Sequence, residues 1–417
     1  MTSNGRIAVA VAVSTEHLPF ARVMVKSLRE HHADVHCYAV VVDGTGDAQD
    51  KTSFTTLSLE DLNIPNARQW CFGYGRDVGV IAVKPHLLEH VLDRGYERVA
   101  FLDADMLIVE ELAGLLSPAA QSAITLTPHF AVPPPPGRAA GQELRILRAG
   151  VFNGGCIGVS EQSEGRRFLS WWQQRLRRHC RHDMTSGMHY DQRWLDLVPS
   201  MFDRVAIDRD VGINVAYWNL EERRLHEENG HWLVNGSVCR LVHFSGFDPN
   251  NPTLVSRHVP GMTIEDAGEF ARLSRHYAAL LVAAGYGNQP LTPDPYGSFD
   301  NGVKIPGVVR DIYLDLGDQA DEFGDPFVTG GSESFFSWLQ SPAQLPSGTE
   351  PMIAHLWEAI YRRRPDVQVA YPHTLGSDRE AFIRWTRESG LREHELEGWP
   401  PAPSTGAVLR DDLRRHQ

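Results

Sequence analysis

The stretch RVAFLDADMLIV, residues 98–109, decides the fold and raises the first question about function. An apolar run ends in Asp103 and Asp105, and a second apolar run follows at once. If residues 98–102 form a strand, both carboxylates project to one side at its end, because strand side chains alternate with a period of two. Two like charges at the end of a buried strand are costly unless a cation neutralises them. The pattern favours a metal site, with simple solvation of the strand end as the alternative.

Strand and helix patterns alternate on both sides of this stretch. We expect strands at 7–13 and 35–42 and amphipathic helices at 20–31 and 79–94. Such alternation predicts parallel strands joined by crossover helices, and hence an α/β protein with a mixed, mostly parallel sheet. Ligands of these sheets bind beyond the carboxyl ends of the strands. Both the aspartates and the loop after the first strand lie at such ends.

The pattern changes after about residue 260. A helix pattern at 264–284 leads into shorter helical pieces rich in Trp and Tyr. We therefore expect an α/β domain over 1–258, a smaller and mainly helical domain over 259–400, and a tail over 401–417. The proline-rich segment 128–142 is expected to be a loop, because proline lacks a backbone donor and fixes φ. It is interpreted as a lid or substrate-facing loop, with a stiff spacer as the alternative.

Composition limits the possible partners of the chain. With 417 residues, 42% of them hydrophobic and 22% charged, it is typical of a soluble protein of two or three domains. A formal net charge of −13 without a basic run argues against nucleic acid as a partner. No apolar run reaches the roughly 18–20 residues of a membrane span, so no transmembrane segment is expected. Five scattered cysteines favour reduced thiols and a cytoplasmic location, and they argue against a zinc site.

A third ligand for a cation is available in CRLVHFSGFDP, residues 239–249. His243 ends the expected strand 239–244, where it is either a metal ligand or a hydrogen-bonded core residue. Its nitrogen, together with two carboxylates, would favour Mn²⁺ over Mg²⁺. A second Asp-x-Asp triplet, Asp208 to Asp210, lies in a polar turn with its own arginine and needs no cation.

Two further motifs lie between the aspartates and His243. Asn153, Gly154 and Gly155 open an expected strand, where paired glycines either let another molecule approach the backbone or form a simple turn. Asp191 and Gln192 stand at the start of an amphipathic helix pattern. There, Asp191 is either a functional carboxylate or an ordinary acidic residue at a helix start.

Taken together, these motifs resemble the GT-A fold glycosyltransferases, and most closely the retaining enzymes of glycosyltransferase family 8, the group that contains glycogenin. The matching stretches span 7–249 and are, in order, VSTEHLPFARVMVKSL, AVKPHLLEHVLDRGYERVAFLDADMLIVEEL, VFNGGCIGVS, HYDQRWLD and LVHFSGFDP. The resemblance implies a hexosyltransferase that moves a sugar, with retention, from a nucleotide-diphosphate sugar, expected to be UDP-linked. It implies a metal cofactor, Mn²⁺ or Mg²⁺, and a glycan, lipid-linked sugar or small natural product as acceptor.

The same resemblance suggests a role for each matching residue. It assigns donor binding to Ser14, Thr15, His17, Lys84, Asp103, Ala104 and Gly154, metal binding to Asp103, Asp105 and His243, and a place at the reacting sugar to Asn153, Asp191 and Gln192. The family often carries a lysine two residues after the metal-binding histidine, and this chain has Ser245 there. We expect Arg257 to replace that lysine, because a guanidinium suits a phosphate.

Two other functions remain open at this point. A nucleotidyltransferase would share the nucleotide and the metal, but VSTEHLPFA, residues 13–21, has no glycine-rich phosphate loop. A sugar-nucleotide-binding protein that has lost catalysis would explain the missing lysine, although the intact aspartate, glycine and Asp191-Gln192 motifs argue against it. The acceptor and the oligomeric state do not follow from the sequence.

Overall fold

The computed structural model describes residues 6–44, 54–116, 121–134, 139–288, 293–343 and 353–399. The chain divides into two compact units, Met1–Ile64 with Asp77–Thr292 and Pro65–Arg76 with Pro293–Gln417. This division differs from the expected boundary after residue 258. The physical reason is that helix α9 (Phe270–Ala283) packs its apolar side against Phe244 and Phe247 in the core of the first unit. The expected tail over 401–417 lies outside the described residues.

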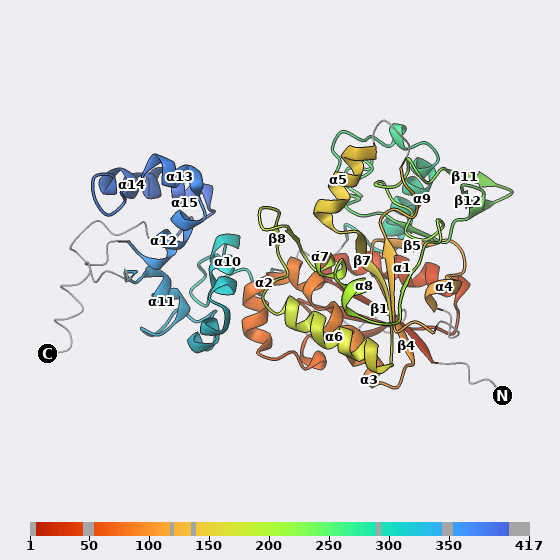
Figure 1. Ribbon diagram of the computed structural model, residues 1–417, viewed down its shortest axis with the longest axis horizontal. Helices are drawn as coiled ribbons and strands as arrows, with labels where there is room; N and C mark the ends of the chain where they lie inside the picture. The colour runs from red at the N-terminus through yellow and green to blue at the C-terminus, as the bar shows by residue number, and fades with distance from the viewer. Residues whose placement is uncertain are drawn as a thin grey trace. The chain divides into compact units, whose positions relative to one another are not determined.

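A seven-stranded sheet forms the centre of the first unit, in the order β10-β6-β7-β4-β1-β2-β3 (Figure 1). Its strands are β1 (Ile7–Val13), β2 (His36–Val41), β3 (Thr55–Leu57), β4 (Arg98–Leu102), β6 (Ile124–Pro128), β7 (Phe152–Ser160) and β10 (Val205–Ile207). All neighbours are parallel except β7, which is antiparallel to both β4 and β6. The expected mixed, mostly parallel α/β sheet is therefore confirmed.

Helices cover both faces of this sheet. Helices α1 (Leu18–His31) and α4 (Ala113–Leu116) share one core with Val9, Val11 and Val13 of β1, while α3 (Lys84–Asp93) and α6 (Ser163–Leu176) pack together on the other face. The helical pattern expected over 79–94 is confirmed apart from a break at Val83 and the terminal Arg94. Two helices, α2 (Ala67–Ala82) and α3, meet at Val83, and Pro85 occupies the first turn of α3, where its missing N–H costs least.

Short elements outside the main sheet bring distant segments together. Strand β5 (Met106–Ile108) pairs antiparallel with β14 (Leu241–His243), and this register sets His243 opposite Met106, next to Asp105. The other short elements are β8 (His182–Asp183), β9 (Met188–His189), β11 (Leu225–Glu228), β12 (His231–Val234), β13 (Ser237–Val238), α5 (Ala139–Ala149), α7 (Gln192–Leu195) and α8 (Val198–Met201). Pro128 ends β6 and α5 begins at Ala139, so the expected loop over 128–142 is wrong at both ends, and its residues 135–138 lie outside the described part of the chain.

The second unit is mainly helical, as expected for the C-terminal part of the chain. Its helices include α10 (Gly307–Asp315), α11 (Phe335–Gln340), α12 (His355–Arg362), α13 (Pro365–Ala370), α14 (Arg379–Trp385) and α15 (Leu391–Glu393). Its core is aromatic: the Phe72 ring contacts those of Tyr313, Phe327 and Phe335 at centroid distances of 4.8–5.5 Å.

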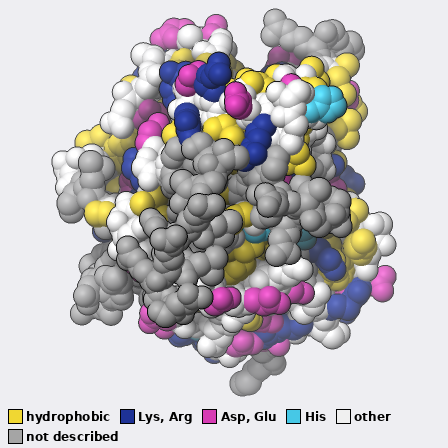
Figure 2. Space-filling model, turned by 90° about the vertical axis from the view of Figure 1, so that its left-hand side faces the viewer, with side chains coloured by type: hydrophobic (Ala, Val, Ile, Leu, Met, Phe, Trp, Pro, Cys, Tyr) yellow, Lys and Arg dark blue, Asp and Glu magenta, His cyan; other side chains and the backbone are white. Residues whose placement is uncertain are grey.

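The described surface carries charges of both signs. On the face that Figure 2 presents, Lys and Arg side chains are interspersed with Asp and Glu side chains. None of the helices that the structure describes combines the length and the apolar composition that crossing a bilayer requires. All five cysteines are buried as thiols.

One buried histidine makes the stability of the fold depend on pH. Burial lowers the pKa of His86, in α3, to about 4, whereas an unfolded histidine titrates near 6.5. Between these values the unfolded chain binds the additional proton, so stability falls as the pH drops from about 6.5 towards 4. We expect His86→Gln to remove up to about 3 kcal/mol of this pH-dependent loss. Urea unfolding of both proteins across this pH range measures it, and equal pH dependence would contradict the assignment.

Candidate functional site

Asp103, Asp105 and His243 form a compact cluster at the carboxyl end of β4. One ligand atom from each lies within 4.8 Å of the others. His243 Nε2 is 3.0 Å from Asp105 Oδ1 and 3.9 Å from Asp103 Oδ2. The two aspartates are about 30% exposed and His243 is buried, so the cluster opens to solvent on the carboxylate side. Two carboxylates and an imidazole are a donor set suited to Mn²⁺ or Mg²⁺, so these residues could hold a divalent ion.

Asn214 and Trp218 orient the imidazole of His243. Its Nδ1 lies 3.0 Å from Oδ1 of the fully buried Asn214 and donates its proton there, which leaves Nε2 facing the aspartates. The Trp218 ring packs edge-on against His243 at 5.3 Å and fixes its plane. A protein ligand of a metal needs this kind of support, because an unsupported ring would rotate away.

A buried ion pair lies beside this cluster. The Lys84 ammonium, at the start of α3, is 3.0 Å from Asp191 Oδ2 and 3.5 Å from Asp103 Oδ1, and it donates to the Gly154 carbonyl at 2.9 Å. Burial alone lowers the pKa of Lys84, but the two carboxylates outweigh burial and raise it. Burial raises the pKa of Asp191, and Lys84 opposes that effect. Asp191 makes no side-chain cap for α7, so it is not an ordinary helix-start carboxylate.

The paired glycines make room for both carboxylates. Gly154 and Gly155 lie within β7, not in a turn. A Cβ on Gly155 would lie 2.0 Å from Asp103 Oδ2, and a Cβ on Gly154 would lie 2.6 Å from Asp191 Oδ2. Any side chain at either position would therefore displace an aspartate.

Asn153, within β7, and Gln192, at the start of α7, are both held by hydrogen bonds to the backbone of β7. Asn153 Oδ1 accepts from the Gly155 N–H at 2.9 Å, and its Nδ2 lies 3.3 Å from His129 Nε2. Burial lowers the pKa of His129 to about 4, so its ring is neutral and its Nε2 accepts while Nδ1–H faces the Val151 carbonyl at 3.2 Å. Gln192 joins the Gly154 N–H, at 3.3 Å, to the Ala149 carbonyl, at 2.8 Å.

The loop after β1 lies at the same end of the sheet. Ser14 Oγ and His17 Nδ1 are 2.8 Å apart. Asp43, which follows the neighbouring strand β2, accepts from Thr15 N at 2.7 Å and from Thr15 Oγ1 at 3.0 Å. Burial raises the pKa of Asp105, whereas His243 and, less strongly, His17 lower it, and the net shift is downward. The loop and the metal-type cluster thus lie at the same end of two paired strands, β1 and β4.

Two of the expected donor-binding residues are less closely tied to the site. Ala104 is half-buried between Asp103 and Asp105 and packs against the hydrophobic core. Arg257 is exposed, and its backbone N–H donates to the Gly246 carbonyl at 2.9 Å. No ion pair within the described residues joins its guanidinium to the two aspartates, so its assignment stays a prediction.

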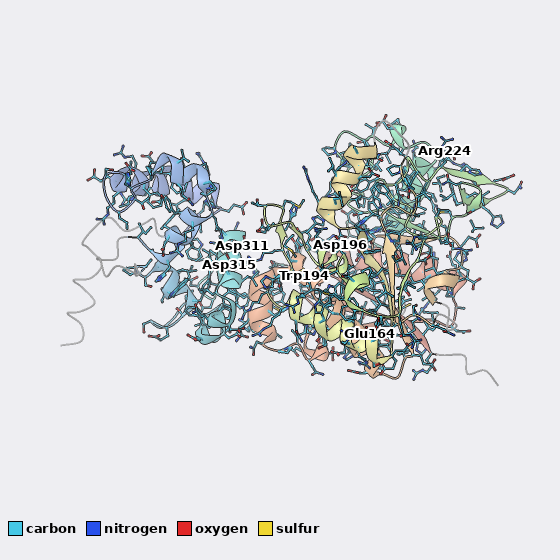
Figure 3. The ribbon with its side chains drawn as sticks, viewed as in Figure 1. Glu164, Trp194, Asp196, Arg224, Asp311 and Asp315 are labelled. Carbon is cyan, nitrogen blue, oxygen red and sulfur yellow. The ribbon has the colours of Figure 1, made fainter. Side chains whose placement is uncertain are left out.

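Several residues that support the site were not expected from the sequence. Asp43 could have been predicted from the sequence, because it closely follows β2, a parallel strand next to β1. Asn214 and His129 could not have been predicted, since each supports a site residue that lies far away in the sequence. Asp196, after α7, accepts from the Val151 N–H at 2.8 Å and anchors the start of β7 (Figure 3).

Comparisons with known proteins give relatives but no family. No protein-family model matches the chain. The Bacillus subtilis (strain 168) protein YfnD is 25% identical over 256 residues, which cover 56% of this chain and 76% of YfnD. YfnF of the same strain is 26% identical over 168 residues, which cover 40% of this chain and 55% of YfnF.

Among solved structures, the chain is similar to the galactosyltransferase LgtC in complex with donor and acceptor sugar analogs. The identity is 13%, the match covers 69% of this chain and 98% of LgtC, and the TM-score is 0.40. It is also similar to the glycosyltransferase GlyE of Streptococcus pneumoniae TIGR4, with 12% identity, coverage of 70% of this chain and 67% of GlyE, and a TM-score of 0.40. A TM-score of this size is too low for either likeness to bear on the chemistry of the site.

The glycine at 155 offers a test of the cluster that leaves its ligands in place. Because a Cβ there would collide with Asp103, we expect Gly155→Ala to weaken Mn²⁺ binding by about 10–100-fold, the usual cost of disturbing a ligand's support. Calorimetry measures it. Gly307→Ala is the matched control, since nothing lies within 4 Å of its added Cβ. Equal Mn²⁺ affinity of Gly155→Ala and the wild type, both folded, would contradict the geometry.

Proposed function

We propose that this protein is a metal-dependent, retaining glycosyltransferase that moves a hexose from a nucleotide-diphosphate sugar, expected to be UDP-linked, to an acceptor hydroxyl. The observation that carries the proposal is the joint arrangement of two charge groups. The Asp103–Asp105–His243 cluster and the buried Lys84–Asp191 pair meet at one strand end, above glycines that leave room for both. The motif resemblance to family 8 supports the same reaction, whereas a nucleotidyltransferase would need a phosphate loop that the sequence lacks.

In this proposal, Asp103, Asp105 and His243 hold the divalent ion, Mn²⁺ or Mg²⁺. When bound, such an ion supplies electrostatic stabilisation of the negative charge that develops on a departing diphosphate. His243 is aimed by Asn214, and the half-exposed carboxylates face solvent, where phosphate oxygens would complete the coordination. The nucleotide would lie against the loop after β1, with Ser14, Thr15 and His17 near its base and ribose.

The donor sugar would lie between the metal-binding cluster and β7. The buried Lys84 charge offsets part of the negative charge of Asp103 and Asp191, which lowers the electrostatic cost of bringing a sugar phosphate into this region. Asn153 and Gly154 would line the sugar pocket. Asp191 and Gln192 would lie on the face of the anomeric carbon opposite the leaving group, where a carboxylate or amide oxygen stabilises oxocarbenium-like charge.

Transfer with retention requires attack from the side on which the leaving group departs. In the route that we favour, the acceptor oxygen forms a bond to the anomeric carbon as the bond from that carbon to the diphosphate oxygen breaks. The acceptor proton passes to the departing diphosphate oxygen, so no protein base is needed. Asp191 is the candidate nucleophile of the competing route through a covalent intermediate, since Gln192 is a poor nucleophile and is already engaged by two backbone groups.

Mass analysis of products from a panel of UDP- and other nucleotide sugars, with Mn²⁺ or with a chelator, tests this function. We expect donor hydrolysis or transfer to require the metal. Asp103→Asn and Asp105→Asn should each lower kcat/KM by about 100-fold or more, because each removes a charged ligand.

Asp208→Asn is the matched control. It changes the acidic residue of the other Asp-x-Asp triplet, which lies outside the cluster. Full metal-dependent activity in both Asp103→Asn and Asp105→Asn would refute the proposal. Metal-dependent nucleotide binding without turnover of any donor would instead indicate a sugar-nucleotide-binding protein.

A further inference from the structure

A large cleft opens next to the proposed sugar position. Its volume is about 1270 Å³, above the ~300–1,000 Å³ of most small-molecule pockets. Asn153 and Gln192 are among the residues that line it. Its walls come from three segments of the first unit: helix α5, residues 217–225 before and at the start of β11, and residues 258–269 before α9. Arg224, labelled in Figure 3, lies on the second of these walls.

The cleft does not include the nucleotide side of the site. Ser14, Thr15, His17, Asp103 and Asp105 are all absent from its lining, although all five are described residues. A donor bound by the metal-type cluster and the loop after β1 would therefore leave most of the cleft unfilled. The space begins where the reacting carbon would lie and extends away from the nucleotide, as required of a second substrate's binding site.

The lining disfavours a strongly anionic occupant. Two arginines, Arg145 and Arg224, line the cleft together with three carboxylates, those of Glu221, Asp266 and Glu269, and Glu269 is paired with Arg272 outside the lining. The remaining lining arginine, Arg223, is buried and paired with Glu222 at 2.9 Å. Charges of both signs along one cleft offer hydrogen-bond donors and acceptors to a polar molecule. They do not favour a bound molecule that carries a large net charge.

The same walls also carry aromatic rings. Tyr217 is half-buried and packs edge-on against Trp218 at 5.1 Å, and its ring is further confined by His258 at 6.4 Å. A ring held in this way is a preformed platform, because little rotamer freedom remains to be lost on binding. Sugars combine apolar C–H faces, which pack on such rings, with a rim of hydroxyls, which suits the charged and amide side chains around them. A lipid chain would not use those polar groups.

We propose that the cleft binds an uncharged oligosaccharide acceptor of at least two sugar rings, with Tyr217 as its stacking platform. This inference rests on the proposed function and names its acceptor class. The terminal ring presents a hydroxyl beside Asn153 and Gln192, and the next ring lies against Tyr217 and α5. The new bond joins that hydroxyl oxygen to the anomeric carbon of the donor, the bond to the diphosphate breaks, and the hydroxyl proton leaves with the diphosphate.

The experiment compares acceptors with one donor that the full-length protein hydrolyses in the presence of Mn²⁺. The probes are methyl glycosides of glucose, galactose and N-acetylglucosamine, the corresponding di- and trisaccharides, the same disaccharides carrying a uronic acid, and octanol. We expect transfer, measured relative to donor hydrolysis, to be at least about tenfold more efficient for uncharged di- and trisaccharides than for the other probes.

Tyr217 variants test the proposed platform. Tyr217→Ala should raise the acceptor KM about tenfold for disaccharides and much less for monosaccharides, whereas Tyr217→Phe keeps the ring face and most of the wild-type efficiency. Equal efficiency for mono- and disaccharides, a preference for the anionic or aliphatic probes, or an unchanged disaccharide KM in Tyr217→Ala would overturn this inference while leaving the proposed function intact. Absence of metal-dependent hydrolysis with every nucleotide sugar would overturn the proposed function itself.

Discussion

The buried ammonium of Lys84 between Asp103 and Asp191 is the interaction on which the rest of the site depends. A lysine and an aspartate so far from solvent would each be costly alone, and each is tolerated because the other is 3.0 Å away. The pair is possible only because β7 carries glycines where it passes under both carboxylates. With Asp191 compensated from within, Asp103 can turn its second oxygen towards Asp105 and His243, where a cation would complete the charge balance.

The strands of the sheet were largely predictable from the sequence. The exact helix ends and the boundary between the two units were not. Strand β1 spans 7–13 as expected, because a continuous apolar run of alternating alanine and β-branched residues is typical of a parallel strand that is buried on both faces. The break at Val83 was missed since apolar spacing continues through it, and only Pro85 marked a new helix. The first unit extends to residue 292 because α9 buries Tyr277 against Phe244, a contact that depends on tertiary packing and not on local composition.

The candidate site also has a part that the sequence predicts and a part that it does not. The cluster of Asp103, Asp105 and His243 was predictable from its residue types, because the aspartates follow the carboxyl end of β4 and His243 ends a strand. In the structure, His243 reaches the aspartates because β14 pairs with β5 outside the main sheet. The side chains that orient these residues were not predictable, since Asn214 reaches His243 from 29 positions away and His129 reaches Asn153 from the segment that follows β6. Residue type and local spacing therefore identify groups that do chemistry, whereas the groups that aim them become visible only in the folded chain.

The central claim is that a divalent cation is held at the end of β4. The most direct measurement is anomalous scattering at the manganese edge from crystals grown with Mn²⁺ and UDP. The account predicts one peak within about 2.0–2.3 Å of oxygens of Asp103 and Asp105 and of His243 Nε2, with diphosphate oxygens in the remaining positions. Bound UDP with no manganese peak at these three side chains, or with manganese held elsewhere, would contradict it.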